Sequence, residues 1–399
     1  MTALSSQAIR QYLIVTGNYW GFTLTDGALR MLVVLHFHQL GYSALSIAML
    51  FLFYEFFGVI TNLVGGWLGA RIGLNKTMNI GLSLQAAALL MLTLPSEFLS
   101  IPWVMAAQAL SGIAKDLNKM SAKSSVKSLI QHGAEGTLFK WVAILTGSKN
   151  TLKGLGFFMG GLLLNLSGFQ GAMWLMLSLI SLVLVLSLIL LNKELGVAKN
   201  KPKFTEIFSN SRAINILSAA RLFLFASRDV WFVVALPVFL SEHFKWDFWQ
   251  VGGFMALWII AYGFIQTLAP VVTSRRDGKT PDGVSALSWA IALATVPLMI
   301  AQGYEQQSVL LGGLLIYGIF FAINSSLHSY LIISYAREDG ASLDVGFYYM
   351  ANAIGRLLGT VLSGLLFQFW GLEACLYLSA TLIILTAVIS IALPRDRSC

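Results

Sequence analysis

The sequence is poor in charge, in cysteine and in proline. Only 11% of its 399 residues are charged and 57% are hydrophobic, whereas a soluble domain carries about 25% charged residues. These proportions exclude an ordinary water-soluble protein and also a disordered chain. The two cysteines, Cys375 and Cys399, exclude a disulfide-stabilised scaffold and a cysteine-rich metal site. The 8 prolines leave room for long uninterrupted helices.

Long apolar segments fill the chain instead. A helix needs about 20 apolar residues to cross a bilayer. Twelve segments reach that length: 12–38, 45–70, 77–94, 103–122, 141–165, 172–192, 214–240, 248–272, 283–301, 309–334, 342–368 and 374–393. The segments 154–161 and 354–364 are rich in small residues and predict close helix packing. We therefore expect an all-α membrane protein with twelve transmembrane helices.

Lysine and arginine are distributed unequally between the two sides of these segments. With the N-terminus placed inside, the inner connections carry 17 of the 26 basic residues and the outer ones carry only Lys245. Cytoplasmic loops are enriched in Lys and Arg in the same way. The count predicts a multi-pass protein of the cytoplasmic membrane with both termini in the cytoplasm. The basic residues lie at the ends of the spans and inside them, which argues against nucleic-acid binding.

A basic, polar connection at 193–213, interrupted by Pro202, divides the chain into halves of six spans, 1–192 and 214–399. Asp26 and Asp229 lie in similar polar inserts 203 positions apart. Two related six-helix bundles are typical of the major facilitator architecture. The sequence has no G-x-x-x-x-G-K-[ST] loop and no convincing catalytic, metal or cofactor motif. We expect a secondary transporter that needs no cofactor, and not an enzyme.

The segment GGWLGARIGLNK (65–76) resembles the loop between the second and third helices of that superfamily. The matching positions are Gly66, Leu68, Arg71, Gly73 and Lys76. In the superfamily this loop controls conformation, which the resemblance assigns here to Gly66, Arg71 and Gly73. An acid usually helps to latch the two halves there, and Ala70 stands in its place, so we expect an altered latch.

Longer blocks resemble the ArsJ group of organoarsenical efflux transporters. They are NYWGFTLTDGALRMLVVLHFHQLG (18–41), YEFFGVITNLVGGWLGARIGL (54–74), ALSGIAKDLNKMSAKS (109–124), LTGSKNTLKGLGFF (145–158) and SAARLFLFASRDVWFVV (218–234). The resemblance implies a transporter of a bacterial inner membrane that exports 1-arseno-3-phosphoglycerate and confers arsenate resistance. We expect it to act as a monomer. A glyceraldehyde-3-phosphate dehydrogenase that accepts arsenate in place of phosphate makes this substrate, so the resemblance also implies a functional link to that enzyme.

Charged residues inside the spans point independently to an anion. Eight basic residues are expected at membrane depth: Arg30, Lys115, Lys119, Lys149, Lys153, Arg221, Arg228 and Arg356. Four acids are expected there: Asp26, Glu55, Asp116 and Asp229. Each isolated charge at the bilayer centre costs at least about 2.5–3.5 kcal/mol. Four acids cannot neutralise eight cations, and the surplus predicts a multiply charged anionic ligand.

The candidate substrate-binding residues are cations and polar donors at mid-depth: Arg30, Lys115, Lys149, Lys153, Arg228, Asn324, His328, Tyr348, Asn352 and Arg356. Arginine suits phosphoryl and arsenyl groups because its guanidinium can bind two oxygens at once. Lysines at 115, 119, 123 and 127 recur every four residues and form a stripe on one helix face. We interpret Lys119 and Lys123 as a cytoplasmic funnel that attracts the anion.

Structural interpretations of the same charges stay open. Asp26 and Arg30 have the spacing of an ion pair within one helix, and Lys119 could extend to the membrane surface instead. Arg228 and Asp229 are adjacent, so we expect them to point apart. Asp26 and Glu55 are the first candidates for carrying protons, and Asp116 and Asp229 are the second.

Cysteine content separates the possible arsenic substrates, because trivalent arsenic is soft and is bound by thiolates. With no cysteine pair, an oxyanion ester is favoured over arsenite. An organophosphate exchanger would need the same cations and stays open as the alternative function. A drug or cation exporter would need an excess of acids, and a receptor or scaffold has no evident use for eight buried cations.

Overall fold

The computed structural model describes residues 6–41, 50–130, 135–191, 195–198, 202–208, 211–246, 248–273 and 280–395, in which all regular structure is helical. The first half contains α1 (Ser6–Gln39), α3 (Leu52–Ile72), α4 (Leu74–Met91), α5 (Ile101–Leu129) and α6 (Glu135–Leu190). The second half contains α7 (Arg212–Phe232), α8 (Ala235–Glu242), α9 (Phe248–Thr273), α10 (Gly283–Ala301), α11 (Gln307–Tyr335) and α12 (Ala341–Ser390). Two short 3-10 helices, η1 (Ser96–Phe98) and η2 (Phe204–Ile207), lie in connections.

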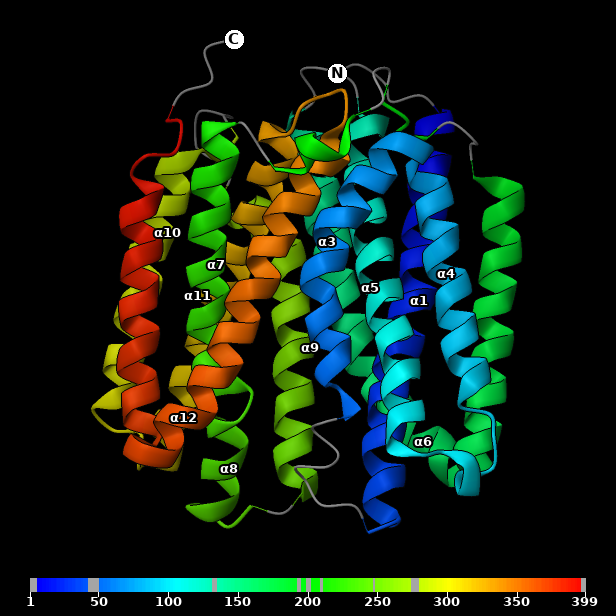
Figure 1. The fold of residues 1–399 in the computed structure, drawn as a ribbon. Coiled ribbons are helices and arrows are strands. Elements are labelled where there is room, and N and C mark those ends of the chain that lie inside the picture. The colour runs from blue at the N-terminus through cyan, green and yellow to red at the C-terminus, as the bar shows by residue number, and fades with distance from the viewer. Residues whose placement is uncertain are drawn as a thin grey trace. The chain divides into compact units, whose positions relative to one another are not determined.

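Each expected span has a helical counterpart in this structure. α6 and α12 each contain two spans, joined at Gly168 (φ 65°) and Gly371 (φ 73°). Glycine adopts this left-handed region without steric cost, and the chain reverses direction there, as the orange and red parts of α12 show (Figure 1). α7 and α8 together cover the seventh span. The prediction of an all-α fold with twelve spans is confirmed.

Six segments are long and apolar enough to cross a membrane by length and composition: Gly136–Leu190, Arg212–Glu242, Gln250–Thr273, Gly283–Ala301, Gln307–Tyr335 and Ala341–Ser390. Many of their large apolar side chains are exposed, including Leu166, Ile189 and Val271. Such apolar surface is unfavourable in water, so hydrocarbon is the solvent that this surface fits.

The chain divides into two compact units. The N-terminal unit comprises 1–138, 148–208 and 336–350, and the C-terminal unit comprises 139–147, 209–335 and 351–399. The boundary after residue 208 falls inside the expected linker 193–213. Two short segments depart from the expected halves: 139–147 of α6 packs in the C-terminal unit, and 336–350, which includes the start of α12, packs in the N-terminal unit.

Helices within each unit approach one another closely at glycines. A Cβ on Gly156 of α6 would lie 2.7 Å from the Leu24 carbonyl oxygen of α1. In the C-terminal unit, a Cβ on Gly359 of α12 would lie 2.8 Å from the Ala226 carbonyl oxygen of α7. Small residues permit this approach between membrane helices. The close packing predicted for 154–161 and 354–364 is confirmed at these two crossings.

Candidate functional site

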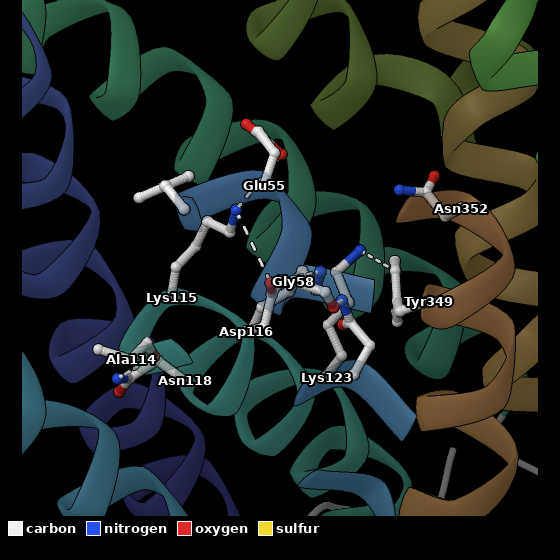
Figure 2. Close-up of polar contacts among 12 residues, drawn as sticks. Glu55, Gly58, Ala114, Lys115, Asp116, Asn118, Lys123, Tyr349 and Asn352 are labelled. Carbon is white, nitrogen blue, oxygen red and sulfur yellow. Dashed lines mark hydrogen bonds and ion pairs between the residues drawn. The ribbon is translucent and has the colours of Figure 1, made fainter. Parts of the chain in front are cut away.

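Glu55 of α3 joins two cations in the N-terminal unit. Its Oε1 accepts a hydrogen bond from Arg30 Nη2 at 2.9 Å, and its Oε2 lies 3.8 Å from Lys115 Nζ (Figure 2). Arg30 of α1 therefore pairs with Glu55 and not with Asp26, its neighbour one turn earlier. The pairing connects α1, α3 and α5.

Asp116 of α5 lies between two lysines of its own helix. Its Oδ1 is 2.5 Å from Lys119 Nζ and its Oδ2 is 3.7 Å from Lys115 Nζ. Gly58 of α3 leaves space for this carboxylate, because a Cβ there would lie 2.7 Å from Asp116 Oδ2 (Figure 2). Lys119 is therefore held in an ion pair and does not extend away to the membrane surface.

Tyr54 links this group of charges to Asp26. The Arg30 guanidinium carbon and Lys115 Nζ each lie 3.9 Å from the centroid of the Tyr54 ring. Both contacts are cation–π interactions. The Tyr54 hydroxyl donates to Asp26 Oδ1 at 2.6 Å, so Asp26 is held by a phenol.

The charges of this cluster balance. Three cations, Arg30, Lys115 and Lys119, face three carboxylates, Asp26, Glu55 and Asp116. We call these six residues, with Tyr54, the balanced cluster. Because it is neutral as a whole, the cationic surplus predicted from the sequence belongs to other residues.

The predicted funnel lysines both meet Tyr349 of α12. Lys119 Nζ and Lys123 Nζ each lie 4.8 Å from the centroid of its ring, and Lys123 Nζ also donates to the Tyr349 hydroxyl (Figure 2). Lys123 is buried. The funnel role stays a prediction, and it requires Lys123 to leave Tyr349.

Lys149 and Lys153 lie on α6 in the N-terminal unit, and both are partly exposed. Lys149 Nζ donates to Asn150 Oδ1 at 3.1 Å, and Lys153 Nζ lies 5.9 Å from the Phe157 ring centroid. Neither contact belongs to the balanced cluster.

In the C-terminal unit, two arginines share one carboxylate. Arg228 Nε donates to Asp229 Oδ1 at 2.6 Å, and Arg356 Nε donates to Asp229 Oδ2 at 3.2 Å. The expectation that Arg228 and Asp229 point apart was wrong. Helix geometry separates their Cβ atoms, but the long arginine side chain folds back along α7 and reaches its neighbour.

Arg221, also on α7, is a third cation in this unit. Its Nε donates to Asn352 Oδ1 at 2.8 Å and its Nη1 donates to the Ser325 carbonyl at 3.2 Å. Its guanidinium lies 3.9 Å from the Phe225 ring centroid. We call Arg221, Arg228 and Arg356 the arginine cluster; the last two bind the carboxylate of Asp229.

Three other predicted residues have different surroundings. Asn324 Nδ2 donates to the carbonyls of Trp289 and Phe320 at 2.8 and 2.9 Å, which gives this amide group a structural role in α11. His328 is fully buried, and neither ring nitrogen has a hydrogen-bond partner among the described residues. Tyr348 is buried in the N-terminal unit, whereas Asn352, one turn later, belongs to the C-terminal unit.

The loop residues Gly66, Arg71 and Gly73 lie at the end of α3. A Cβ on Gly66 would overlap the Ser342 carbonyl of α12, and Ser342 Oγ donates to the Gly66 carbonyl at 2.8 Å. The Arg71 guanidinium lies 5.3 Å from the Trp67 ring centroid. Gly73 has φ 103° and separates α3 from α4.

The linker is fastened to this loop by backbone hydrogen bonds. Ala198 N donates to the Ala70 carbonyl at 2.9 Å, and Leu74 N donates to the Leu195 carbonyl at 2.8 Å. The indole of Trp67 adds a hydrogen bond to the Pro202 carbonyl at 3.1 Å. At the position where an acid is usual, the backbone carbonyl of Ala70 therefore holds the linker. Backbone groups occur at every position, so no residue pattern could have predicted this hydrogen bond.

A repeat of 203 positions relates further residues of the two halves. It connects Asp26 to Asp229, and it equally connects Lys153 to Arg356 and Gly156 to Gly359. The two glycines make the equivalent helix crossings in the two units. Applied to every charged residue, the same offset would have identified Arg356 as the counterpart of Lys153.

The chemistry open to these groups is anion binding. The membrane-depth cations outside the balanced cluster are Lys149 and Lys153 in one unit and the arginine cluster in the other. In the part of the chain that the structure describes, no three His, Cys, Asp or Glu side chains lie close enough to hold a metal ion.

Solved transporter structures have the same fold. The human organic anion transporter TETRAN matches with a TM-score of 0.76 and 17% identity, over 96% of this chain and 99% of that one. A bacterial homologue of the iron transporter ferroportin, in its outward-facing state, matches with a TM-score of 0.72 and 15% identity, over 95% and 98%. The E. coli fucose:proton symporter matches with a TM-score of 0.73 and 12% identity, over 96% and 98%. No curated protein sequence matches this chain.

The family model described as Major Facilitator Superfamily matches residues 12–342 and 217–398. These matches span nearly the whole chain, and the helical spans and the repeated glycine crossings agree with them. The chain therefore belongs to the major facilitator superfamily of multi-pass membrane transporters.

Proposed function

We propose that this transporter exports an organoarsenical oxyanion ester, 1-arseno-3-phosphoglycerate, by alternating access, in which the two bundles expose a central site to one side of the membrane at a time. It acts as a monomer in the bacterial inner membrane and confers arsenate resistance. Its functional partner is a glyceraldehyde-3-phosphate dehydrogenase that forms the ester from arsenate.

The observation that carries this proposal is the arginine cluster of the C-terminal unit. Arg228 and Arg356 share one carboxylate, Asp229, and Arg221 on the same helix as Arg228 donates to Asn352 and the Ser325 carbonyl. An arginine can bind two phosphoryl or arsenyl oxygens at once, so a group of arginines suits an oxyanion. One of the structural neighbours carries organic anions by name, which agrees with this substrate class.

The small number of cysteines supports a pentavalent arsenic ester as the substrate in place of arsenite. Cys375 is buried on α12, and Cys399 lies outside the described residues. Trivalent arsenic would be held by several thiolates. The choice of arsenic over phosphorus rests on the resemblance to the ArsJ group, and an organophosphate exchanger with the same cations is the alternative.

Transport into everted membrane vesicles separates the two functions. The ester is generated outside the vesicles by the dehydrogenase from glyceraldehyde 3-phosphate, NAD and arsenate, and radiolabelled 3-phosphoglycerate is tested in parallel. Uptake of arsenic that requires both the dehydrogenase and the transporter supports the proposal. Exchange of 3-phosphoglycerate without arsenic uptake would establish the alternative.

Cells provide a second test. In a strain without other arsenic exporters, arsenate tolerance should require this chain together with the dehydrogenase, and arsenite tolerance should not change. The Arg228→Gln variant, expressed at the same level, is the control. Protection against arsenite by this chain alone would contradict an oxyanion ester as the substrate.

A further inference from the structure

The triad of Arg228, Asp229 and Arg356 has a feature that charge balance alone does not explain. Each oxygen of the Asp229 carboxylate binds a different arginine, so the two guanidiniums are held on either side of one small group. Arg228 comes from α7 and Arg356 from α12, two helices that cross closely at Gly359. The carboxylate thereby fixes the spacing of two arginines that come from separate helices.

We propose that Arg228 and Arg356 form a two-arginine fork that binds one tetrahedral oxyanion end of the substrate, and that Asp229 is the positioning residue behind the fork. The inference rests on the proposed function, because it takes the substrate to be an oxyanion ester. It adds that a phosphoryl or arsenyl end binds within the C-terminal unit.

Burial indicates on which side the anion binds. The Asp229 side chain has no exposed surface, whereas 15% of the Arg228 side chain and 29% of the Arg356 side chain are exposed. An anion therefore reaches the guanidiniums and not the carboxylate. Arg228 binds Asp229 through Nε and Nη2, and Arg356 binds it through Nε. A guanidinium has five N–H donors in a planar array, so Asp229 uses only part of the donors of each arginine.

Aromatic rings restrict the movement of Arg228. Its guanidinium carbon lies 5.0 Å from the ring centroid of Phe225, 5.4 Å from that of Phe321 and 5.7 Å from that of Phe232. A guanidinium held among rings and a carboxylate is preorganised, so binding costs less side-chain entropy. Two cations against one carboxylate leave one positive charge on the triad, which suits one anionic end.

A purely structural triad is the competing interpretation. Adjacent residues on a helix do not face each other, so Arg228 must fold back to reach Asp229, and a buried carboxylate needs only one partner for neutrality. A second arginine is unnecessary for folding but necessary for a fork. The two interpretations also differ in the expected effect of replacing either arginine with lysine. Lysine keeps the positive charge, which is enough for a structural ion pair, but it loses the planar array of donors that a fork needs.

The test measures binding of 3-phosphoglycerate and of inorganic arsenate to the purified full-length protein in nanodiscs, by calorimetry. Arg228→Lys and Arg356→Lys should each weaken binding of 3-phosphoglycerate at least tenfold, with thermal stability within a few degrees of the wild type. Asp229→Asn should weaken binding, and Asp229→Glu should restore part of it. Arg337→Lys is the matched control, because Arg337 also binds one carboxylate, Asp344, but is 48% exposed. The Arg337→Lys variant should bind 3-phosphoglycerate as tightly as the wild type.

Failure of the two proposals is distinguishable. If the wild type binds neither anion, the proposed substrate class is wrong. If the wild type binds 3-phosphoglycerate and both lysine variants bind it equally well, only the fork is wrong. Should the lysine variants misfold, arginine labelling with phenylglyoxal replaces them: 3-phosphoglycerate should protect Arg228 and Arg356 of the wild type but not Arg337. Labelling of all three at unchanged rates would overturn the fork.

Discussion

Single charged residues in this protein differ in how deeply they and their partners are buried. Asp116 is held between Lys115 and Lys119, with its side chain 2% exposed, and Glu55 bridges Arg30 and Lys115 with its side chain 34% exposed. Water screens an exposed pair and leaves it little net energy. A buried pair that loses one partner leaves an uncompensated charge. The two acids should therefore differ in what they contribute to stability.

Asp116→Asn should lower the free energy of unfolding by about 3 kcal/mol, because two partly buried lysines lose their shared carboxylate. Glu55→Gln should cost about 1 kcal/mol or less, since its side chain is a third exposed. Thermal unfolding of both variants in the same detergent measures the difference. Equal shifts in melting temperature would contradict the role of burial.

Two variants separate proton uptake by the Asp26 carboxylate from the hydrogen bond that Asp26 accepts. Asp26→Asn should still bind substrate but lose the response of transport to a pH gradient, because an amide cannot take up a proton. Tyr54→Phe removes the hydroxyl that donates to Asp26 and keeps the carboxylate, so it should retain the response. Transport into vesicles with an imposed pH gradient distinguishes them. If Asp26→Asn responds like the wild type, Glu55, Asp116 or Asp229 becomes the candidate.

At the scale of helices, the packing depends on a few crossings where a glycine lets two backbones approach closely. Gly359→Ala places a Cβ 2.8 Å from the Ala226 carbonyl oxygen, so α12 must move away from α7. We expect a loss of about 1–3 kcal/mol, as for other overpacked sites. Gly312→Ala is the control, because nothing lies within 4 Å of its added Cβ. Similar melting temperatures for the two variants would contradict close packing at Gly359.

The hydrogen bonds that hold the linker to the end of α3 can be tested separately. Ala198→Pro removes the N–H that donates to the Ala70 carbonyl, because proline has no amide hydrogen. Trp67→Phe keeps a ring beside Phe204 and removes the donor to Pro202. Both variants should be cleaved faster in the linker by limited proteolysis, at unchanged melting temperature. Cleavage at the wild-type rate would show that these hydrogen bonds do not hold the linker.

The sequence predicts helices better than contacts between them. Apolar length alone located the spans, including the division of α6 near Gly168, because a bilayer imposes a fixed length. The pairing of Arg30 with Glu55 depends on how α1 packs against α3, which no local spacing encodes. The prediction that Arg228 and Asp229 point apart was wrong because it used only the directions of the Cβ atoms and not the length of the arginine side chain.

At the scale of the whole molecule, orientation is the simplest quantity to test. The unequal distribution of Lys and Arg predicts that both termini and the linker are cytoplasmic. Cysteine labelling from outside intact cells, at positions added to the termini and beside Lys245, measures it. Only the position beside Lys245 should react. A reactive terminus would reverse the orientation and remove the basis of the cytoplasmic funnel.

The surplus of membrane-depth cations has an electrical consequence. If the eight cations and four acids expected at membrane depth are all charged, an empty carrier holds positive charge within the field of the membrane, and the proposed anion reduces or reverses that charge. Moving one elementary charge across 100 mV is worth about 2.3 kcal/mol. In a cell with a negative interior, the voltage therefore drives the anion-loaded state outward and holds the empty state inward. We therefore expect the proposed export to be electrogenic and to slow when the membrane is depolarised, even if the pH gradient is unchanged.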